Sequence, residues 1–332
     1  MYSSSGVFNT MTVFSTMRSS TTNKSTGSYS IQFDKWTHIF LVFNNNTRLL
    51  QTYINGNLHA SVSVPAATDF TTNVLRLNYN AVYGGNGPAF SIPYYSYDVR
   101  VYDKALSKKE ILQLSKGLIF HYKCNDIQEY ENNTLNDFSG FDNHATITGE
   151  LSEDTLQNSG RYNKCIFFNG SSAACIGNLS TLLPDGNFTF NCWFKVPSLG
   201  SKAWATILGG PSGFELETRI RSTSYAYIHP YSWGGGSTDT PNSYSIAYDL
   251  NTWNMLTMVR TTSNTKFYLN GELKVTGLAG SIPSGNYYIG SWRDASSQNY
   301  YGYTSDTRIY ATALSDSDVA NLYKDSMIVD NL

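Results

Sequence analysis

Residues 266–275 read KFYLNGELKV, and residues 52–60 read TYINGNLHA. In each stretch two runs rich in aromatic and aliphatic residues meet at an Asn-Gly pair, Asn270-Gly271 in one and Asn55-Gly56 in the other. Asn and Gly tolerate the positive φ angles that both central residues of a type I′ turn require. Each stretch is therefore predicted to form a tight β-hairpin, and the chain contains that hairpin twice.

The sequence around the two hairpins is duplicated as well. A Trp-led strand precedes each hairpin, KWTHIFLVFN from Lys35 and TWNMLTMVRT from Thr252. Similar segments follow them, YDVRVYDKALSKKEILQL from Tyr97 and SDTRIYATALSDSDVANL from Ser305. Because the order and the spacing match, we interpret the chain as a tandem repeat.

Local signals define the elements of each copy. Ser107 stands three residues before Glu110, and Ser315 stands three before Asp318, as in a helix capping box. Each copy is therefore predicted to end in a strand followed by a short helix. Elsewhere apolar and polar residues alternate with period two between Gly, Asn and Ser turns, as in NFTFNCWFKV from Asn187. Many short strands of this kind predict an all-β, antiparallel sandwich.

Composition excludes two classes of partner. Charged residues are 14% of the 332 residues and the net charge is -2, so there is no cluster of Lys and Arg for a phosphate backbone or an anionic membrane. No apolar run approaches the about 20 residues that span a bilayer. The first residues, MYSSSGVFNTMTVF, lack the basic head and apolar stretch of a signal peptide. We expect neither nucleic-acid binding nor membrane insertion.

The ordered set of motifs resembles a known family. NFTFNCWFKV, a Trp-led strand, a YLNG hairpin, a D-x-R-[IV]-Y strand and AL-S before a helix are together similar to laminin-G-like domains with the concanavalin A-like jelly roll. GLIFHYKCND, DFSGFDNHATITG and RYNKCIFFNG are similar to the front of such domains in phage-encoded and secreted bacterial proteins. The resemblance implies two antiparallel sheets, frequent carbohydrate binding and usually no catalysis.

The two copies are unequal, because residues 118–213 have no counterpart upstream. We expect residues 1–116 to form a partial laminin-G-like sandwich (the back half only), residues 117–325 a complete one, and residues 326–332 a tail. Natural sheets avoid uncovered strand edges, so the first copy needs a cover. We favour strands encoded in a longer parent chain; the alternatives are the second domain packing across the gap and a homo-oligomer or larger assembly whose other subunit completes the first domain.

Two loops carry the residue types of a sugar site. Such a site pairs an exposed Trp or Tyr with a few planar hydrogen-bonding side chains, and YIHPYSWGGGSTD (227–239) and GSWRDASSQNYYG (290–302) supply both. The candidate glycan-binding residues are Tyr231, Trp233, Trp292, Arg293, Asp294 and Tyr300. The alternative is that Trp233 and Trp292 only cap the ends of the sandwich.

The loop DFSGFDN offers oxygen ligands. Asp137, Asp142 and Asn143 are the candidate metal residues, because carboxylate and amide oxygens are what Ca²⁺ takes. A structural Ca²⁺ is the one cofactor considered. The alternative, slightly favoured, is an Asx-rich turn that holds no metal.

Catalysis is not expected. Glu215 and Glu217 in FELETR are two residues apart and share a face of a strand, and glycosidases use a pair of carboxyl groups. The resemblance implies an Asp between them and a second Glu further on, whereas this chain has Leu216 between them and Thr218-Arg219 after them. We interpret the pair as surface carboxylates balanced by Arg219 and Arg221.

The sequence thus predicts a noncatalytic carbohydrate-binding or adhesion module whose partner is a cell-surface glycan. It would belong to a phage virion, on the tail or capsid surface, or to a secreted bacterial protein, so a virion or extracellular location is expected. The alternative is a structural or decoration protein that makes only protein contacts. A glycoside hydrolase is the less favoured third hypothesis.

Overall fold

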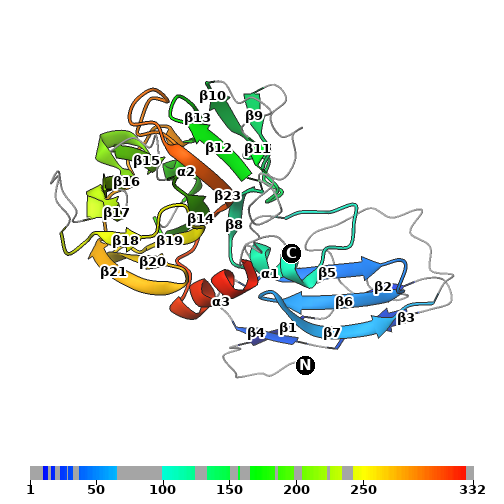
Figure 1. Ribbon diagram of the computed structural model, residues 1–332. Coiled ribbons are helices and arrows are strands. Elements are labelled where there is room, and N and C mark those ends of the chain that lie inside the picture. Colours follow the sequence, from blue (N-terminus) through cyan, green and yellow to red (C-terminus); the bar gives the residue numbers. More distant parts are fainter. Residues whose placement is uncertain are drawn as a thin grey trace. The chain divides into compact units, whose positions relative to one another are not determined.

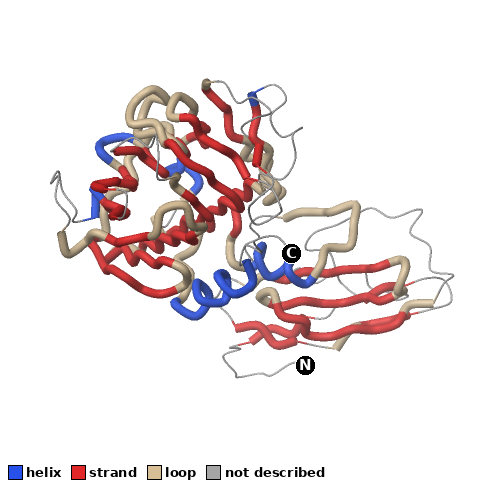
Figure 2. Tube along the Cα trace, viewed as in Figure 1, coloured by secondary structure: helices blue, strands red, loops and turns tan. Residues whose placement is uncertain are grey.

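The computed structural model describes residues 10–13, 16–18, 23–27, 29–32, 37–65, 99–123, 133–149, 156–157, 165–183, 186–197, 204–222, 225–233 and 242–326. Strands dominate both parts of the chain (Figure 2), and every pairing between the named strands is antiparallel, as the alternating sequence predicts. The chain divides into two compact units, residues 1–115 and residues 116–332, each described below by itself.

Unit 1 contains the first hairpin. Its elements are β1 (Thr10–Val13), β2 (Thr16–Arg18), β3 (Asn23–Ser25), β4 (Tyr29–Gln32), β5 (Ile39–Asn44), β6 (Leu49–Ile54), β7 (Asn57–Ser63) and α1 (Lys108–Ser115). β6 pairs with both β5 and β7, and the β6–β7 turn has φ 48° at Asn55 and φ 78° at Gly56. The predicted turn is therefore confirmed.

Helix α1 starts at the predicted cap. The Glu110 amide donates to Ser107 Oγ at 3.2 Å, and the Ser107 amide donates back to Glu110 Oε2 at 2.7 Å. The helix buries Ile111 against a small cluster that includes Val42, Tyr53 and Leu106. This cluster lies on one face of the β5–β6–β7 sheet.

The predicted strand before α1 is wrong for the part of unit 1 that the structure describes. Val99–Tyr102 is neither helix nor strand there, although it reads like the corresponding strand of unit 2. A strand needs a neighbour to take its main-chain hydrogen bonds. The segments that supply this neighbour in unit 2 belong to residues 118–213, which unit 1 does not repeat.

Unit 2 is a β-sandwich (Figure 1). Its strands are β8 (Leu118–Tyr122), β9 (Thr134–Leu135), β10 (Ala145–Thr148), β11 (Leu156–Gln157), β12 (Cys165–Asn169), β13 (Ala173–Gly177), β14 (Phe188–Lys195), β15 (Trp204–Gly209), β16 (Glu215–Ser222), β17 (Tyr225–Pro230), β18 (Ile246–Tyr248), β19 (Asn254–Arg260), β20 (Asn264–Leu269), β21 (Glu272–Leu278), β22 (Tyr287–Ile289) and β23 (Tyr301–Tyr310). Its helical segments are α2 (Leu179–Leu182), the 3₁₀ turns η3 (Pro211–Gly213) and η4 (Tyr231–Trp233), and α3 (Asp316–Ser326).

These strands form two sheets. Sheet I has the order β18-β17-β16-β15-β22-β13-β10-β9, and sheet II has the order β11-β12-β23-β14-β19-β20-β21 with β8 on β23. The order of neighbours departs widely from the order of the chain, as in a jelly roll. The predicted fold class, an all-β sandwich of the concanavalin A-like kind, is therefore correct.

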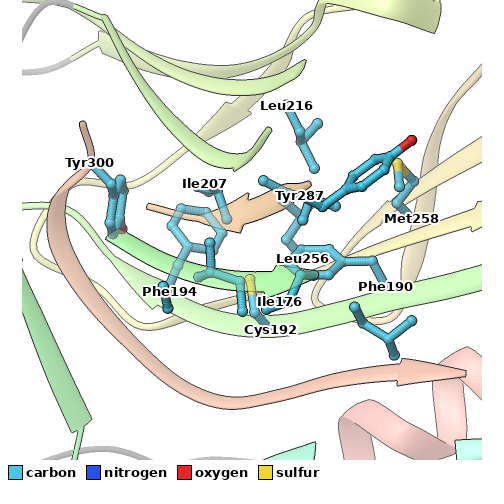
Figure 3. Close-up of a cluster of buried hydrophobic side chains, with 14 of the residues drawn as sticks. Ile176, Phe190, Cys192, Phe194, Ile207, Leu216, Leu256, Met258, Tyr287 and Tyr300 are labelled. Atoms are coloured by element: carbon cyan, nitrogen blue, oxygen red, sulfur yellow. The ribbon is translucent and has the colours of Figure 1, made fainter. Parts of the chain in front are cut away.

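One buried layer joins the sheets. Ile207 and Leu216 of sheet I and Phe190, Cys192 and Phe194 of sheet II belong to the same hydrophobic cluster (Figure 3). Alternate residues of each strand point to opposite faces, which is why Asn191 and Trp193 leave this layer. Sheet I therefore has one apolar face toward the core and one outer face.

Helix α3, red in Figure 1, covers the other face of sheet II. Its Val319 and Leu322 pack with Trp193, Met255 and Tyr268. The second hairpin, β20–β21, turns at Asn270 (φ 53°) and Gly271 (φ 80°), and the helix begins after the predicted Ser315 cap. Unit 2 thus stacks sheet I, sheet II and one helix.

Candidate functional site

Strand β16 presents two different faces. Leu216 and Ile220 pack on the core, so Glu215, Glu217 and Arg219 lie on the outer face of sheet I. All three of these charged side chains are buried, so the expectation that Glu215 and Glu217 are surface carboxylates is wrong. Charged groups are rarely buried unless they are paired, so their contacts define the candidate site.

These charged side chains form hydrogen bonds with one another and with Thr206 and Gln298. Arg219 Nε donates to Glu217 Oε2 at 2.6 Å, and Thr206 Oγ1, on the adjacent strand β15, donates to Glu215 Oε1 at 2.7 Å. In the amide orientation that matches its neighbours, Gln298 donates to Glu217 Oε1 at 3.1 Å and also to Glu215 Oε1. We call Thr206, Glu215, Glu217, Arg219 and Gln298 the outer-face cluster.

One carboxyl group of the cluster, that of Glu215, has a raised pKa. Burial and then the negative charge of Glu217 raise the pKa of Glu215 from 4.5 to about 8, although Thr206 and Arg219 act in the opposite direction. Glu215 is therefore mostly protonated at pH 7. The guanidinium of Arg219 lies on Glu217, so the positive charge is paired inside the cluster.

The loop between β22 and β23 covers this cluster. Asn299 and Thr206 form an isolated parallel β-bridge, and the Thr206 amide donates to the Gln298 carbonyl at 2.9 Å. Beside it, a Cβ on Gly209 would collide with the carbonyl oxygens of Ser291 and Trp292. The loop can lie this close to β15 only because residue 209 has no side chain.

Trp204 is the exposed part of the site. It stands opposite Arg219 in the β15–β16 register and on the same outer face as Thr206. Its side chain is 42% exposed, and the Arg219 Cζ lies 5.5 Å from the ring centroid. A cation over one face holds the indole in place, while part of the ring remains open to solvent.

Trp204 was not among the sequence candidates. The signal for it is the alternation in WATILG, because Ala205 and Ile207 are core residues and so place Trp204 on the opposite face. An aromatic residue in a strand is usually assigned to the core. Its position on the outer face depends on how β15 enters the sheet.

Four of the predicted glycan residues lie on or near this outer face. Trp292, Arg293 and Asp294 belong to the covering loop, where the Arg293 Cζ lies 3.9 Å from the Trp292 ring centroid. The Asp294 carboxylate accepts hydrogen bonds from the amides and hydroxyls of Ser296 and Ser297, which lower its pKa. Tyr231, half-buried in η4, contacts His229, the residue opposite Glu217 on β17.

The expectation that Trp233 is exposed is wrong. Trp233 is fully buried, with its ring edge-on to Phe214 at 4.9 Å and to Phe267 at 5.5 Å. Gly277 and Gly280 make room for it, since a Cβ on either would collide with Trp233. Turn η4 therefore directs the indole into the core. This burial agrees with the alternative in which Trp233 only caps an end of the sandwich.

Tyr300 is also a core residue and not an exposed contact (Figure 3). It is fully buried, and its hydroxyl donates to the Tyr303 carbonyl at 3.4 Å. The sequence places it in a polar loop, NYYG, next to an Asn. Its main chain is held beside the end of β22, because the Tyr300 amide donates to the Gly290 carbonyl at 2.8 Å.

The metal hypothesis does not fit the contacts of Asp137. Its Oδ1 accepts from the amides of His121 and Ser139, and its Oδ2 accepts from Ser139 Oγ and from the Asn143 amide. A carboxylate has about four lone-pair sites, and protein donors take all of them. Asp142 is exposed with φ 57°. The bonds from the Ser139 and Asn143 amides to Asp137 are those of an Asx-rich turn.

A metal cluster is not seen elsewhere in the described ranges, where no three His, Cys, Asp or Glu side chains are grouped to hold an ion. In the same part of the chain, no helix is long and apolar enough to cross a membrane.

The fold and the sequence together define a lectin-like sandwich. The chain belongs to the concanavalin A-like lectin/glucanases superfamily, whose laminin-G-like family model matches residues 2–112 and residues 168–320. The two matched regions correspond to the two copies of the repeat. No curated protein matches the sequence.

Solved structures give distant likenesses. Domain 4 of AbnA, a GH43 extracellular arabinanase from Geobacillus stearothermophilus solved with arabinotriose, is 20% identical with a TM-score of 0.42 over 62% of this chain and 98% of that one. The botulinum neurotoxin serotype D binding domain is 18% identical with a TM-score of 0.43 over 63% of this chain and 52% of that one. This chain therefore spans about half the length of that toxin domain. Likenesses of this size carry no functional argument.

Proposed function

We propose that the chain binds carbohydrate without catalysis, through the outer face of sheet I. The observation that carries the proposal is the Trp204 ring, which is 42% exposed on the outer face of sheet I and held by Arg219. A pyranose offers an apolar face to an aromatic ring and hydroxyl groups to planar polar side chains. The lectin/glucanase family to which the chain belongs is consistent with this ligand class.

The covering loop would form the rim of the site. Trp292, Arg293 and Asp294, with Tyr231 on η4, remain the proposed additional contacts, whereas Trp233 and Tyr300 are withdrawn as core residues. Asp294 would act by shaping the loop, because Ser296 and Ser297 already use its carboxylate oxygens. Arg293 is the exposed donor of this group.

The burial of the carboxyl pair supports a noncatalytic function. A hydrolase needs both carboxyl groups within reach of a glycosidic bond, and here Glu215 and Glu217 are each only 2% exposed. Their oxygens bind Thr206, Arg219 and Gln298 instead of facing solvent. We therefore propose that the pair positions the loop.

The proposal includes the predicted biological setting. Recognition of a cell-surface glycan by a virion or by a secreted bacterial protein suits a chain that is poor in charged residues and rich in Ser, Thr, Asn and Tyr. Carbohydrate binding by the first unit is not proposed.

The test of carbohydrate binding is a glycan array probed with the full chain and with Trp204→Ala. We expect the wild type to bind a restricted set of glycans and Trp204→Ala to lose about 5- to 150-fold in affinity, because a stacking contact contributes about 1–3 kcal/mol by analogy with a base on an aromatic ring. Phe138→Ala is the matched control, since Phe138 is 43% exposed and has Lys123 Nζ 4.5 Å from its ring centroid. Equal losses in both variants, or no glycan bound, would contradict the site.

A separate assay tests for catalysis. The wild type is incubated with the glycans that it binds on the array, and with β-glucans and galactans, and new reducing ends are measured. We expect none. Turnover that Glu215→Gln abolishes would show that the carboxyl pair is catalytic and that the loop opens over it.

A further inference from the structure

The duplicated hairpins allow the same strand to be compared in two surroundings. The His38 carbonyl accepts from the Asn55 amide at 2.8 Å, and the Met255 carbonyl accepts from the Asn270 amide at 2.8 Å. This equivalence aligns β5 of unit 1 with β19 of unit 2. Ile39 then corresponds to Leu256, and Leu41 corresponds to Met258.

The aligned residues differ in burial. Ile39 and Leu41 are 42% and 51% exposed, whereas Leu256 and Met258 are fully buried. The same holds for the segment before the last helix, where Val99 and Val101 are 52% and 77% exposed and the equivalent Thr307 and Ile309 are at most 1% exposed. The apolar pattern is therefore present in both copies but covered in one.

In unit 2, sheet I packs over Leu256 and Met258 in the hydrophobic core, and beside them in sheet II lies strand β14. It pairs with β19 on one side and with β23 on the other, and it sets Cys192 opposite Leu256 and Phe190 opposite Met258. β14 lies within residues 118–213, the part that unit 1 does not repeat. In the described part of unit 1, β5 has β6 as its single neighbour.

The main chain of β5 is also oriented to receive a strand. His38 bonds toward β6, and residues of an antiparallel strand alternate in the side to which they bond. The amides and carbonyls of Ile39 and Leu41 therefore point to the opposite edge. An apolar strip and a row of main-chain donors and acceptors thus lie along the same edge, which is the arrangement used in β-strand addition.

We propose that the β5 edge of unit 1 binds an extended strand of another polypeptide that has the pattern of β14. The strand would run antiparallel to β5, with large apolar side chains at alternate positions against Ile39 and Leu41. Its other edge would give Val99–Tyr102 the neighbour that β14 gives β23. This surface is separate from the proposed glycan site, which belongs to unit 2.

The probe is a fluorescent peptide with the sequence of residues 187–196, NFTFNCWFKV, kept reduced and added to the full chain. We expect saturable binding by anisotropy and slower hydrogen exchange at the amides of Ile39 and Leu41. Leu41→Lys should weaken binding about tenfold or more, because it replaces an apolar contact by a charge. Leu41 is half-exposed, so this variant is expected to fold.

The controls distinguish binding at the β5 edge from nonspecific hydrophobic binding. Leu58→Lys changes an equally exposed Leu on β7, the other edge strand of the same sheet, and should leave binding within twofold. A peptide with Phe190→Lys and Cys192→Lys should not bind. Equal binding to the Leu41 and Leu58 variants, or no saturable binding to the wild type, would overturn the proposal. Self-association that Leu41→Lys removes, without peptide binding, would make a second copy the occupant instead.

Discussion

The protonated carboxyl of Glu215 makes the stability of unit 2 depend on pH. Its pKa is about 8 in the folded protein and near its ordinary 4.5 in the unfolded chain. Between these values the folded protein holds a proton that the unfolded chain has released, so the free energy of unfolding falls as pH rises. The fall is at most about 1.4 kcal/mol per pH unit, and it is absent below pH 4.5.

Thermal melts from pH 4.5 to pH 9 test this expectation. Glu215→Gln keeps a neutral side chain at every pH, so the midpoint of the wild type should decline relative to that of the variant as pH rises. Glu272→Gln, on an exposed carboxylate of β21, is the control and should follow the wild type. Parallel profiles for wild type and Glu215→Gln would show that Glu215 ionises normally.

Asp306 is the second buried carboxylate whose removal should be measurable. It accepts Nε and Nη2 of Arg308 at 2.8 Å each and lies 2.8 Å from His121 Nε2, and the charge of Arg308 and the bond to His121 lower its pKa in spite of burial. Asp306→Asn would leave the buried guanidinium without its counter-charge. We expect a loss of about 3–5 kcal/mol in the free energy of unfolding, measured by urea denaturation, and no loss for Glu272→Gln.

Single aromatic residues are where sequence reasoning was least accurate. Trp233 and Tyr300 stand among Gly, Ser and Asn, which favours an exposed loop, yet both are buried. Trp204 stands in a strand, which favours the core, yet it is exposed. Burial is set by the path of the chain around the residue, such as turn η4 for Trp233, and not by the neighbours in the sequence.

The position of the loop from Gly290 to Asn299 depends on Gly209 of strand β15. Gly209→Ala should push the loop away from β15, because the added methyl group collides with the main chain of Ser291 and Trp292. We expect the Gln298 contact with the carboxyl pair to be lost and the amide of Thr206, which donates to Gln298, to exchange faster. Glycan binding, if the site is correct, should fall as well.

Hydrogen exchange followed by mass spectrometry measures this effect. Gly27→Ala is the matched control, because a Cβ there makes only ordinary contacts, the nearest at 3.8 Å. Unchanged exchange at Thr206 in Gly209→Ala would mean that the loop accommodates the methyl group without moving.

Elements with local signals were predicted correctly, and elements that need a distant partner were not. The Asn-Gly turns, the Ser107 and Ser315 caps and the alternating faces of β5 and β14 depend on neighbouring residues, and the structure confirms them. The strand expected at Val99–Tyr102 depends on a neighbour from elsewhere in the fold. The outer-face cluster likewise joins β15, β16 and a loop about 80 residues later, which no spacing in the sequence reveals.

The division into two units leads to a prediction about the whole molecule. Unit 2 has a continuous core between sheets I and II and a second cluster under α3. Among the described residues of unit 1, the buried cluster under α1 comprises Val42, Tyr53, Leu106 and Ile111. Each such side chain contributes roughly 1.5–3 kcal/mol on burial, while ordering each residue costs about 1–2 kcal/mol. The free energy of unfolding of the partial sandwich alone is therefore expected to be small.

We expect residues 117–332, expressed alone, to unfold cooperatively as a monomer, and residues 1–116 to aggregate or to remain unfolded. Exposed Ile39, Leu41, Val99 and Val101 give the smaller fragment an apolar surface and a strand edge that favour association. Calorimetry and light scattering on the two fragments measure both outcomes, and adding the NFTFNCWFKV peptide to residues 1–116 should reduce its aggregation. A monomeric, cooperative transition of residues 1–116 without peptide would show that unit 1 is a complete small domain. It would also show that this domain stays folded with its β5 edge exposed to solvent.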